Sequence, residues 1–197
     1  MKFVKLIGII IGLLFFAFAI TPMFLEDEYS TQRSTLVNAP VEVVFAQVNN
    51  VKNWTKWGPW MKDETMEVQY GAITEGLNAS YSWTSENSGN GILKIARLEE
   101  NKSLNTDLNF DGSQANGFWT FEEQSDGVKV TWGFKGMANN YFQRYLSLVI
   151  DTMAGEMFEE GLESLKEVAE KAALETPKTE EIEEDETQKD ELTEDED

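Results

Sequence analysis

The sequence predicts an α+β domain made of one strand, two short helices, a series of antiparallel strands and a long C-terminal helix. Two observations lead to this prediction. Short segments of alternating polar and apolar residues follow one another between residues 67 and 135, with turn residues between them. Apolar residues then recur at three- and four-residue steps over 140–173, which is typical of a helix, here about 50 Å long. Such a helix needs a large curved partner to cover its apolar face.

The composition limits the kinds of function. The chain has 197 residues, no Cys, no His and a net charge of −20. Disulfides, thiolate chemistry, zinc sites and Ser-His or Cys-His nucleophiles are therefore excluded, and we expect no cofactor and no metal. The acidic balance argues against nucleic-acid binding, because neutralising phosphates requires clustered Lys and Arg.

The N-terminal segment, residues 1–25, predicts a single transmembrane anchor. Two lysines precede an uncharged run over 6–25, about the length needed to cross a bilayer. Acidic residues at 26–28 follow, so the positive-inside bias predicts a cytoplasmic N-terminus and a domain on the exported (periplasmic or extracytoplasmic) side. The alternative is a signal peptide cleaved near the Ala-Phe-Ala sequence at 17–19, which would leave a secreted or periplasmic protein.

The domain begins with a strand and two short helical segments. Alternation from Tyr29 to Val37 predicts the strand, and Pro40 suits the first turn of a helix whose apolar positions run from Val41 to Val48. Residues 51–60 then predict a second helical turn that Gly58-Pro59 ends.

Strand-like segments occupy 67–70, 77–85, 91–99, 103–110, 116–123 and 128–135. The short turns between them predict antiparallel pairing of neighbours. The segment 91–99 is apolar on both of its faces, which predicts a strand covered on both sides.

The last segment, 176–197, consists mainly of Glu and Asp and predicts a disordered acidic tail. The chain thus divides into the anchor at 1–25, a folded domain at 29–173 and this tail. The tail either keeps the protein soluble or binds a protein partner or cations.

Two motifs lie at opposite ends of the folded domain. The first consists of Asn38-Ala39-Pro40, Glu42, Val44-Phe45, Val48, Trp54, Trp57, Pro59 and Trp60. The second is MFEEGLESLK at 157–166. Both resemble motifs of membrane-anchored polyketide cyclase/dehydrase-like proteins of the START-like (SRPBCC) superfamily, and the resemblance covers 29 to about 173. It implies a helix-grip (START/Bet v 1-like) fold, in which a curved antiparallel sheet wraps around the C-terminal helix and leaves an apolar cavity. Gly155 and Gly161 are unfavourable inside a helix, which indicates either close approach of the backbone or a bend where the helix meets the sheet.

Aromatic and Met side chains on the predicted inner faces are the candidate ligand-binding residues: Tyr81, Trp83, Phe110, Trp119, Trp132, Phe134, Met153 and Met157. Large rings with one polar edge and adaptable thioethers suit a pocket for an apolar ligand. The alternative is that these side chains fill a solid core. The tryptophans at 54, 57 and 60 either wedge the small helices over the open end of the sheet or form the mouth of the cavity.

Three functions follow as hypotheses. The first is a non-catalytic, membrane-tethered module that binds a lipid or another hydrophobic small molecule. The second is an envelope scaffold that contacts proteins through its acidic tail. The third is a cyclase/dehydrase-type enzyme that uses Tyr and carboxylates, for which Arg33, Glu67, Asp107 and Glu122 are strand residues that we interpret as solvated. Such an enzyme requires at least one buried, mutually bonded acid or Tyr pair facing the cavity.

Overall fold

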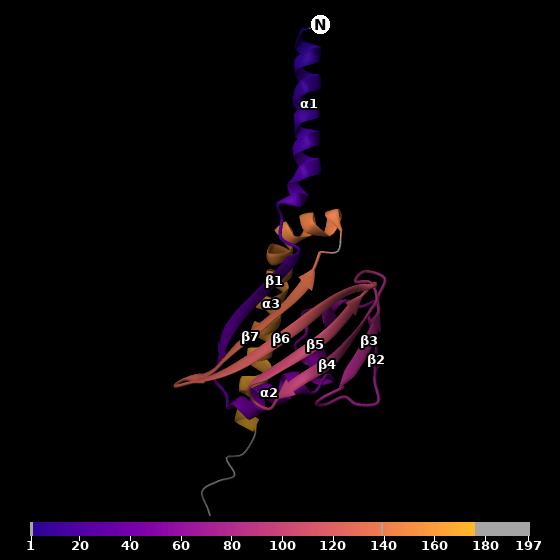
Figure 1. Cartoon of the computed structure of the whole chain (residues 1–197). Coiled ribbons are helices and arrows are strands. Elements are labelled where there is room, and N and C mark those ends of the chain that lie inside the picture. The colour runs from indigo at the N-terminus through magenta and orange to yellow at the C-terminus, as the bar shows by residue number, and fades with distance from the viewer. Residues whose placement is uncertain (1, 139, 176–197) are drawn as a thin grey trace, which may run out of the picture.

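The computed structural model describes residues 2–138 and 140–175, and it confirms the α+β prediction (Figure 1). A helix projects from a domain in which one antiparallel sheet and one long helix form two layers. The elements are α1 (Lys2–Ile20), the 3₁₀ turn η1 (Thr21–Met23), β1 (Glu28–Val37), α2 (Val41–Asn49), the 3₁₀ turns η2 (Asn53–Lys56) and η3 (Pro59–Lys62), β2 (Glu67–Tyr70), β3 (Ser80–Thr84), β4 (Gly91–Glu99), β5 (Ser103–Phe110), β6 (Ser113–Gln124), β7 (Gly127–Met137) and α3 (Tyr141–Glu175). The tail expected at 176–197 lies outside the described residues.

The sheet has seven strands in the order β1-β7-β6-β5-β4-β3-β2, and every neighbouring pair is antiparallel. The short turns predicted from the sequence join β3 to β4, β4 to β5, β5 to β6 and β6 to β7. The pairing of β1 with β7 places Glu28 opposite Met137, so the strand that follows α1 lies beside the strand that precedes α3. The start of β1 and the end of β7 therefore lie together at one end of the sheet, where α1 and the start of α3 connect to it.

The expectation that β4 is covered on both faces is wrong. Its register shifts between Ile95 and Arg97, which marks a β-bulge. Beyond the bulge, Leu98 lies opposite the buried Leu104 and so falls on the same face as Leu93 and Ile95. Ile92 remains on the outer face and is exposed. Leu93, Ile95 and Leu98 therefore lie on one covered face of the strand, and Ile92 lies on the other.

The segment between β1 and β2 departs from the prediction at its two prolines. Pro40 is the N-cap of α2 rather than a residue of its first turn. Pro59 opens a further 3₁₀ turn, η3, rather than ending the preceding one. These short helices place two indoles under the sheet. The Trp54 Nε1–H donates to the Val48 carbonyl at 2.8 Å and the Trp57 Nε1–H to the Gln47 carbonyl at 3.2 Å.

The helix α3 packs along the inner face of the sheet with the residues that the apolar pattern predicts, among them Phe158, Leu162 and Leu165. Both glycines stand where the helix meets the sheet. A Cβ at Gly161 would lie 2.6 Å from Cζ3 of Trp132, and one at Gly155 would meet the Arg33 guanidinium. The predicted role of these glycines in close approach is thus confirmed.

Arg33 ties β1 to α3. Its Nε donates to Glu159 Oε1 at 2.7 Å and its Nη1 to Asp151 Oδ1 at 3.0 Å. Thr31 also donates to Asp151 Oδ1. These hydrogen bonds hold the pKa of the Asp151 carboxyl below its ordinary value, and the Arg33 guanidinium has a larger effect than the Thr31 hydroxyl.

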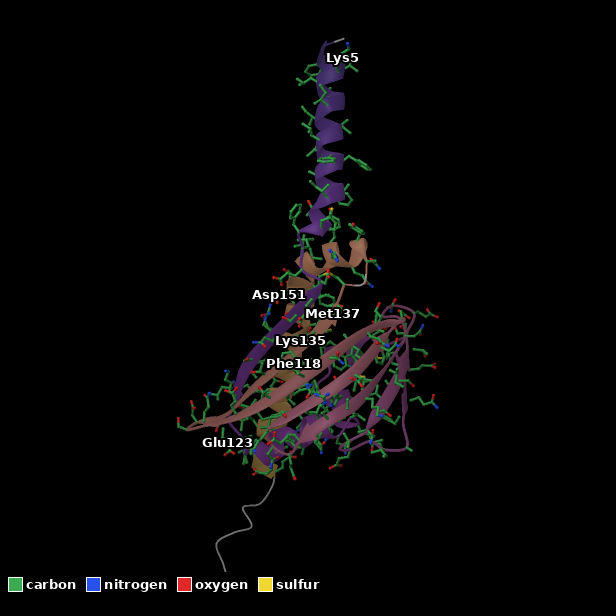
Figure 2. The ribbon with its side chains drawn as sticks, viewed as in Figure 1. Lys5, Phe118, Glu123, Lys135, Met137 and Asp151 are labelled. Atoms are coloured by element: carbon green, nitrogen blue, oxygen red, sulfur yellow. The ribbon has the colours of Figure 1, made fainter. Side chains whose placement is uncertain are left out.

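The helix α1 projects from the domain with its side chains exposed (Figure 2). It is long and apolar enough over Phe3–Met23 to cross a membrane, a property that a signal sequence shares. At its base the Phe18 ring stacks on Tyr145 of α3, with centroids 4.6 Å apart. The Arg144 guanidinium donates to the Pro22 carbonyl at 2.8 Å and pairs with Asp27. The first turns of α3 therefore hold the base of α1.

Candidate functional site: a cavity between the sheet and the long helix

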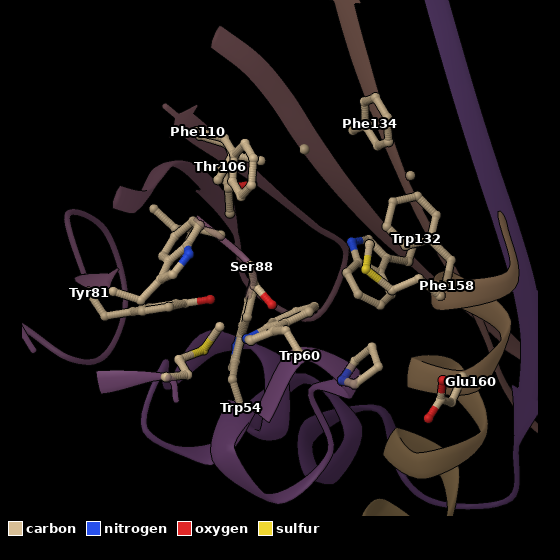
Figure 3. A pocket seen from close by; sticks show the side chains of 18 residues that line it. Trp54, Trp60, Tyr81, Ser88, Thr106, Phe110, Trp132, Phe134, Phe158 and Glu160 are labelled. Carbon is tan, nitrogen blue, oxygen red and sulfur yellow. The ribbon is translucent and has the colours of Figure 1, made fainter. Parts of the chain in front are cut away.

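A cavity of about 510 Å³ lies between the sheet, η3 and α3 (Figure 3). Its volume is within the range of about 300–1,000 Å³ typical of small-molecule sites. The lining residues are Trp54, Pro59, Trp60, Met66, Tyr81, Trp83, Ser88, Leu93, Thr106, Leu108, Phe110, Gly117, Trp132, Gly133, Phe134, Met157, Phe158 and Glu160. Most of these side chains are aromatic or aliphatic, so the lining is apolar with a few polar groups.

Six of the eight candidate ligand-binding residues line this cavity: Tyr81, Trp83, Phe110, Trp132, Phe134 and Met157. They come from the strands β3, β5 and β7 and from α3, and strand alternation brings the strand residues to one face of the sheet. Two of the three tryptophans of the short helices, Trp54 and Trp60, also contribute.

Three candidates lie elsewhere. Trp119 is buried behind the lining and stacks on Trp132, with ring centroids 4.5 Å apart, so its neighbour covers it. Trp57 is 2% exposed and belongs to the core rather than to a mouth. Met153 is 64% exposed, because α3 turns Gly155 toward the sheet and leaves Met153 on its flank.

Several lining residues were not among the candidates. The alternation of β5 places Thr106 and Leu108 on the same face as Phe110, so that signal could have found them. Phe158 is part of the C-terminal motif and of the apolar pattern of α3. Ser88 and Met66 lie in loops, where no periodicity indicates which way a side chain points.

The mouth of the cavity is marked by its exposed apolar lining residues, Phe110 at 42% and Met157 at 37%. Phe110 ends β5 and pairs with Ser113 at the start of β6. Through β6 and β7, this is the end of the sheet at which Glu28 pairs with Met137. The mouth thus lies at the end of the domain from which α1 projects (Figure 1).

Two polar groups meet inside the cavity, where Figure 3 shows the Tyr81 hydroxyl and the Trp60 indole side by side. Burial raises the pKa of Tyr81 far above its ordinary value, and nearby Tyr70 adds to the effect, so this hydroxyl stays protonated. The Trp60 side chain is close enough to offset part of that rise, yet the two groups do not align as a hydrogen bond. The buried Trp60 N–H therefore has no partner among the described residues.

A hydrogen-bond cluster around Asp63 fixes the β3–β4 hairpin beside the cavity. Asp63 Oδ2 accepts from the Ser85 hydroxyl at 2.5 Å and from the Ser88 hydroxyl at 2.7 Å, and Oδ1 accepts from the Thr65 hydroxyl at 2.7 Å. These donors, Ser85 first, hold the pKa of Asp63 well below its ordinary value. The Ser88 hydroxyl is thereby turned toward Asp63 rather than toward a ligand.

The strand residues considered for catalysis do not line the cavity. Glu67, Asp107 and Glu122 are exposed, and Arg33 is bound to α3. The lining carboxylate, Glu160, pairs with Lys62. Across the described ranges, no group of three or more acidic residues could hold a metal ion.

A family model described as polyketide cyclase/dehydrase and lipid transport matches residues 29–170. The chain belongs to this family. The resemblance seen in the two terminal motifs and the helix-grip prediction are both confirmed. The family fold is compatible with binding of a hydrophobic ligand, and the cavity lies where the helix-grip fold places one. No curated protein matches the chain.

Solved structures share the fold of this family member at low sequence identity. Protein SA2116 of Staphylococcus aureus, a protein of unknown function, has a TM-score of 0.57 at 12% identity, with 75% of this chain and 96% of that chain covered. Protein CV1439 of Chromobacterium violaceum has a TM-score of 0.55 at 12% identity, with 72% and 98% covered. DynU16, from the dynemicin biosynthetic locus, has a TM-score of 0.54 at 12% identity, with 73% of this chain and 48% of that chain covered.

Proposed function

We propose that this family member is a membrane-tethered, non-catalytic module that binds a lipid or another hydrophobic small molecule in the cavity between the sheet and α3. The observation that carries the proposal is an open cavity of about 510 Å³ with an almost entirely apolar lining. An apolar ligand that enters the cavity removes its own surface and that of the aromatic side chains from water. This burial contributes a favourable free energy of about 25 cal/mol per Å² of apolar surface.

The polar pair inside the cavity suggests one feature of the ligand. The Trp60 N–H is buried without a partner, and the Tyr81 hydroxyl beside it remains protonated. A ligand oxygen that entered beside Tyr81 and displaced the Trp60 ring slightly would accept from both groups, which relieves the penalty of an unpaired buried donor. We therefore favour an apolar molecule that carries a carbonyl, carboxyl or hydroxyl oxygen.

The non-catalytic part of the proposal rests on the lining. Glu160 is held by Lys62, and no other carboxylate lines the cavity in the part of the chain that the structure describes. Tyr81 is hydrogen-bonded neither to an acid nor to Tyr70, so the buried, mutually bonded acid or Tyr pair that an enzyme would need is missing from the described lining. The tethering part rests on α1, whose exposed apolar surface is suited to a bilayer.

The test is ligand retention by the full chain. Native mass spectrometry of the detergent-extracted protein, followed by organic extraction, should reveal a bound lipid or similar molecule. Brominated fatty acid should quench the intrinsic fluorescence, because four of the six tryptophans line the cavity.

A matched pair of variants localises the binding. Leu108→Trp fills the cavity from β5, whereas Ile92→Trp adds the same ring on the exposed outer face of β4. We expect Leu108→Trp to lose the extracted ligand and Ile92→Trp to keep it, with both melting cooperatively. The proposal would be contradicted if both variants fold and retain the ligand equally. It would also be contradicted if the unaltered chain shows neither bound ligand nor quenching.

A further inference from the structure

Exposed apolar side chains gather at the end of the domain where α1 leaves it. We call this surface the junction face, and it consists of Phe24, Met137, Tyr141, Leu148, Val149 and Met153. Four of these residues belong to the first turns of α3, and Met137 ends β7, which Figure 2 places beneath the base of α1. Exposed apolar side chains that gather in one region of a domain mark an interaction site.

The neighbouring element identifies the occupant. Tyr145 stacks on Phe18 and donates to its carbonyl, and Arg144 binds the Pro22 carbonyl and Asp27. These contacts fix the start of α3 against the base of α1. If α1 spans a membrane, as the proposed function holds, the junction face lies at the boundary between lipid and water. Tyr and apolar side chains are favoured at that depth.

Charge on the same surface indicates the kind of bilayer. Glu26, Asp27 and Glu28 are exposed beside the junction face, and Arg144 is already paired with Asp27. An anionic surface would repel these carboxylates, so attraction between charges does not drive the contact. Insertion of the apolar side chains of the junction face between zwitterionic headgroups would require no such attraction.

An apolar path connects the junction face to the cavity. Val149, Met153 and Met157 are spaced four residues apart, so they lie one above the other on one face of α3. All three are exposed, and Met157 also lines the mouth. A ligand that leaves the bilayer along this path would stay in contact with apolar atoms until it reaches Phe110 and Met157.

We propose that the junction face rests in the interface of a zwitterionic bilayer and that the cavity exchanges its ligand directly with that bilayer along Val149, Met153 and Met157. This inference rests on the proposed function, because it assigns a route and a docking surface to the same cavity. It also gives Met153, which lies outside the lining, a place in ligand transfer.

Spin labels test the docking, because the chain has no Cys and each label can be placed alone. The full chain is reconstituted in phosphatidylcholine vesicles with a label at Leu148→Cys, Met153→Cys, Leu13→Cys or Leu174→Cys. Leu174 is the matched control, since it is an exposed apolar residue near the opposite end of α3. We expect the labels at 13, 148 and 153 to be accessible to oxygen and protected from a water-soluble nickel reagent. The label at 174 should be accessible to the nickel reagent and less accessible to oxygen.

The other outcomes overturn the inference in distinguishable ways. In the first, the labels at 148 and 153 are as accessible to water as the label at 174, and the label at 13 lies in lipid. This result would show that the junction face does not contact the bilayer, and it would leave the anchor and the cavity proposal intact. Labels protected from both reagents indicate a protein covering the face. If the label at 13 is accessible to water, α1 does not span the bilayer and the inference fails. Ligand extraction from the same sample tests the cavity proposal independently.

A second experiment tests the path. A brominated fatty acid supplied in phosphatidylcholine vesicles should quench the cavity tryptophans of the reconstituted chain. Met153→Glu places a charge on the path, and Leu174→Glu places the same charge on the control site. We expect Met153→Glu to slow quenching severalfold while the final extent stays the same, and Leu174→Glu to behave as the unaltered chain. Equal rates in both variants would overturn the proposed route.

Discussion

Asp63 shows how one carboxylate can fix a loop beside the cavity. It accepts hydrogen bonds from three hydroxyls that belong to two separate segments, the stretch after η3 and the β3–β4 hairpin. Bonds to the charged form of a carboxyl stabilise that form, so the pKa of Asp63 is lowered in the folded state only. The cluster is therefore strongest when Asp63 is ionised.

Asp63→Asn should lower stability at neutral pH and weaken its acid dependence. In the unfolded chain Asp63 titrates near its ordinary value of about 3.9, whereas the folded pKa lies well below that. The stabilisation is thus fully present above about pH 3.9 and is lost as the pH falls through the folded pKa. Urea unfolding from pH 7 to 2 should show a constant gap between the two proteins at neutral pH that narrows progressively below about pH 4. Asp126→Asn, in the exposed β6–β7 turn, is the control, and a gap between Asp63→Asn and the unaltered chain that does not narrow in acid would contradict the assignment.

Tyr81→Phe tests the polar pair without changing the shape of the cavity. Removing the hydroxyl deletes one donor to a ligand oxygen and leaves the apolar lining in place. Affinity for a fatty acid should fall about fivefold, which corresponds to a hydrogen bond of about 1 kcal/mol, while affinity for a hydrocarbon probe of similar length is unchanged. Fluorescence titration with both probes checks this, and an equal loss for both would point to a packing role instead.

At the scale of elements, the two glycines of α3 differ in what surrounds them. A Cβ at Gly161 would press on Trp132, whose ring is held between Trp119 and Phe158, and would lie 3.1 Å from Cδ of Pro59. A Cβ at Gly155 would meet the end of the Arg33 side chain, which can withdraw. The same substitution should therefore have different consequences at the two positions.

Ala gains about 1 kcal/mol over Gly in a helix interior, and overpacking a rigid site costs about 1–3 kcal/mol. We expect Gly161→Ala to destabilise the fold by up to about 2 kcal/mol after both terms. Gly155→Ala should be nearly neutral, because partly exposed ion pairs such as Arg33–Asp151 contribute little. Denaturant midpoints of the two variants measure the difference, and equal midpoints would refute the contrast.

Periodicity explains how far the elements could be predicted. The positions of the strands and of α3 follow from alternation and from the three- and four-residue steps, since both patterns report a covered face. The bulge in β4 was not visible, because an extra residue mimics a strand that is apolar on both sides. Met153 fits the helical pattern, but the pattern cannot tell whether sheet, solvent or another surface covers a helix face.

On the scale of the whole molecule, tertiary contacts decided which candidates reached the cavity. The sequence indicated inner faces, and six of the eight candidates on them line one space. It could not separate the lining from the layer behind it, as the stack of Trp119 on Trp132 illustrates. The depth of a side chain in a packed core depends on neighbours that are distant in sequence. The Asp63 cluster was missed for the same reason.

The anchor is the remaining prediction at this scale. The apolar side chains of α1 are exposed, Phe15 at 73% and Phe16 at 62%, and burying such surface yields about 25 cal/mol per Å². We therefore expect the native chain to remain in membranes after carbonate extraction, with an intact mass that includes residues 1–25. Leu13→Lys should weaken this retention, because a charge at the centre of a membrane helix costs about 3 kcal/mol on the insertion scale. Ile73→Lys, at an exposed apolar residue between β2 and β3, is the control. A soluble chain that begins near Ile20 would instead identify α1 as a signal peptide.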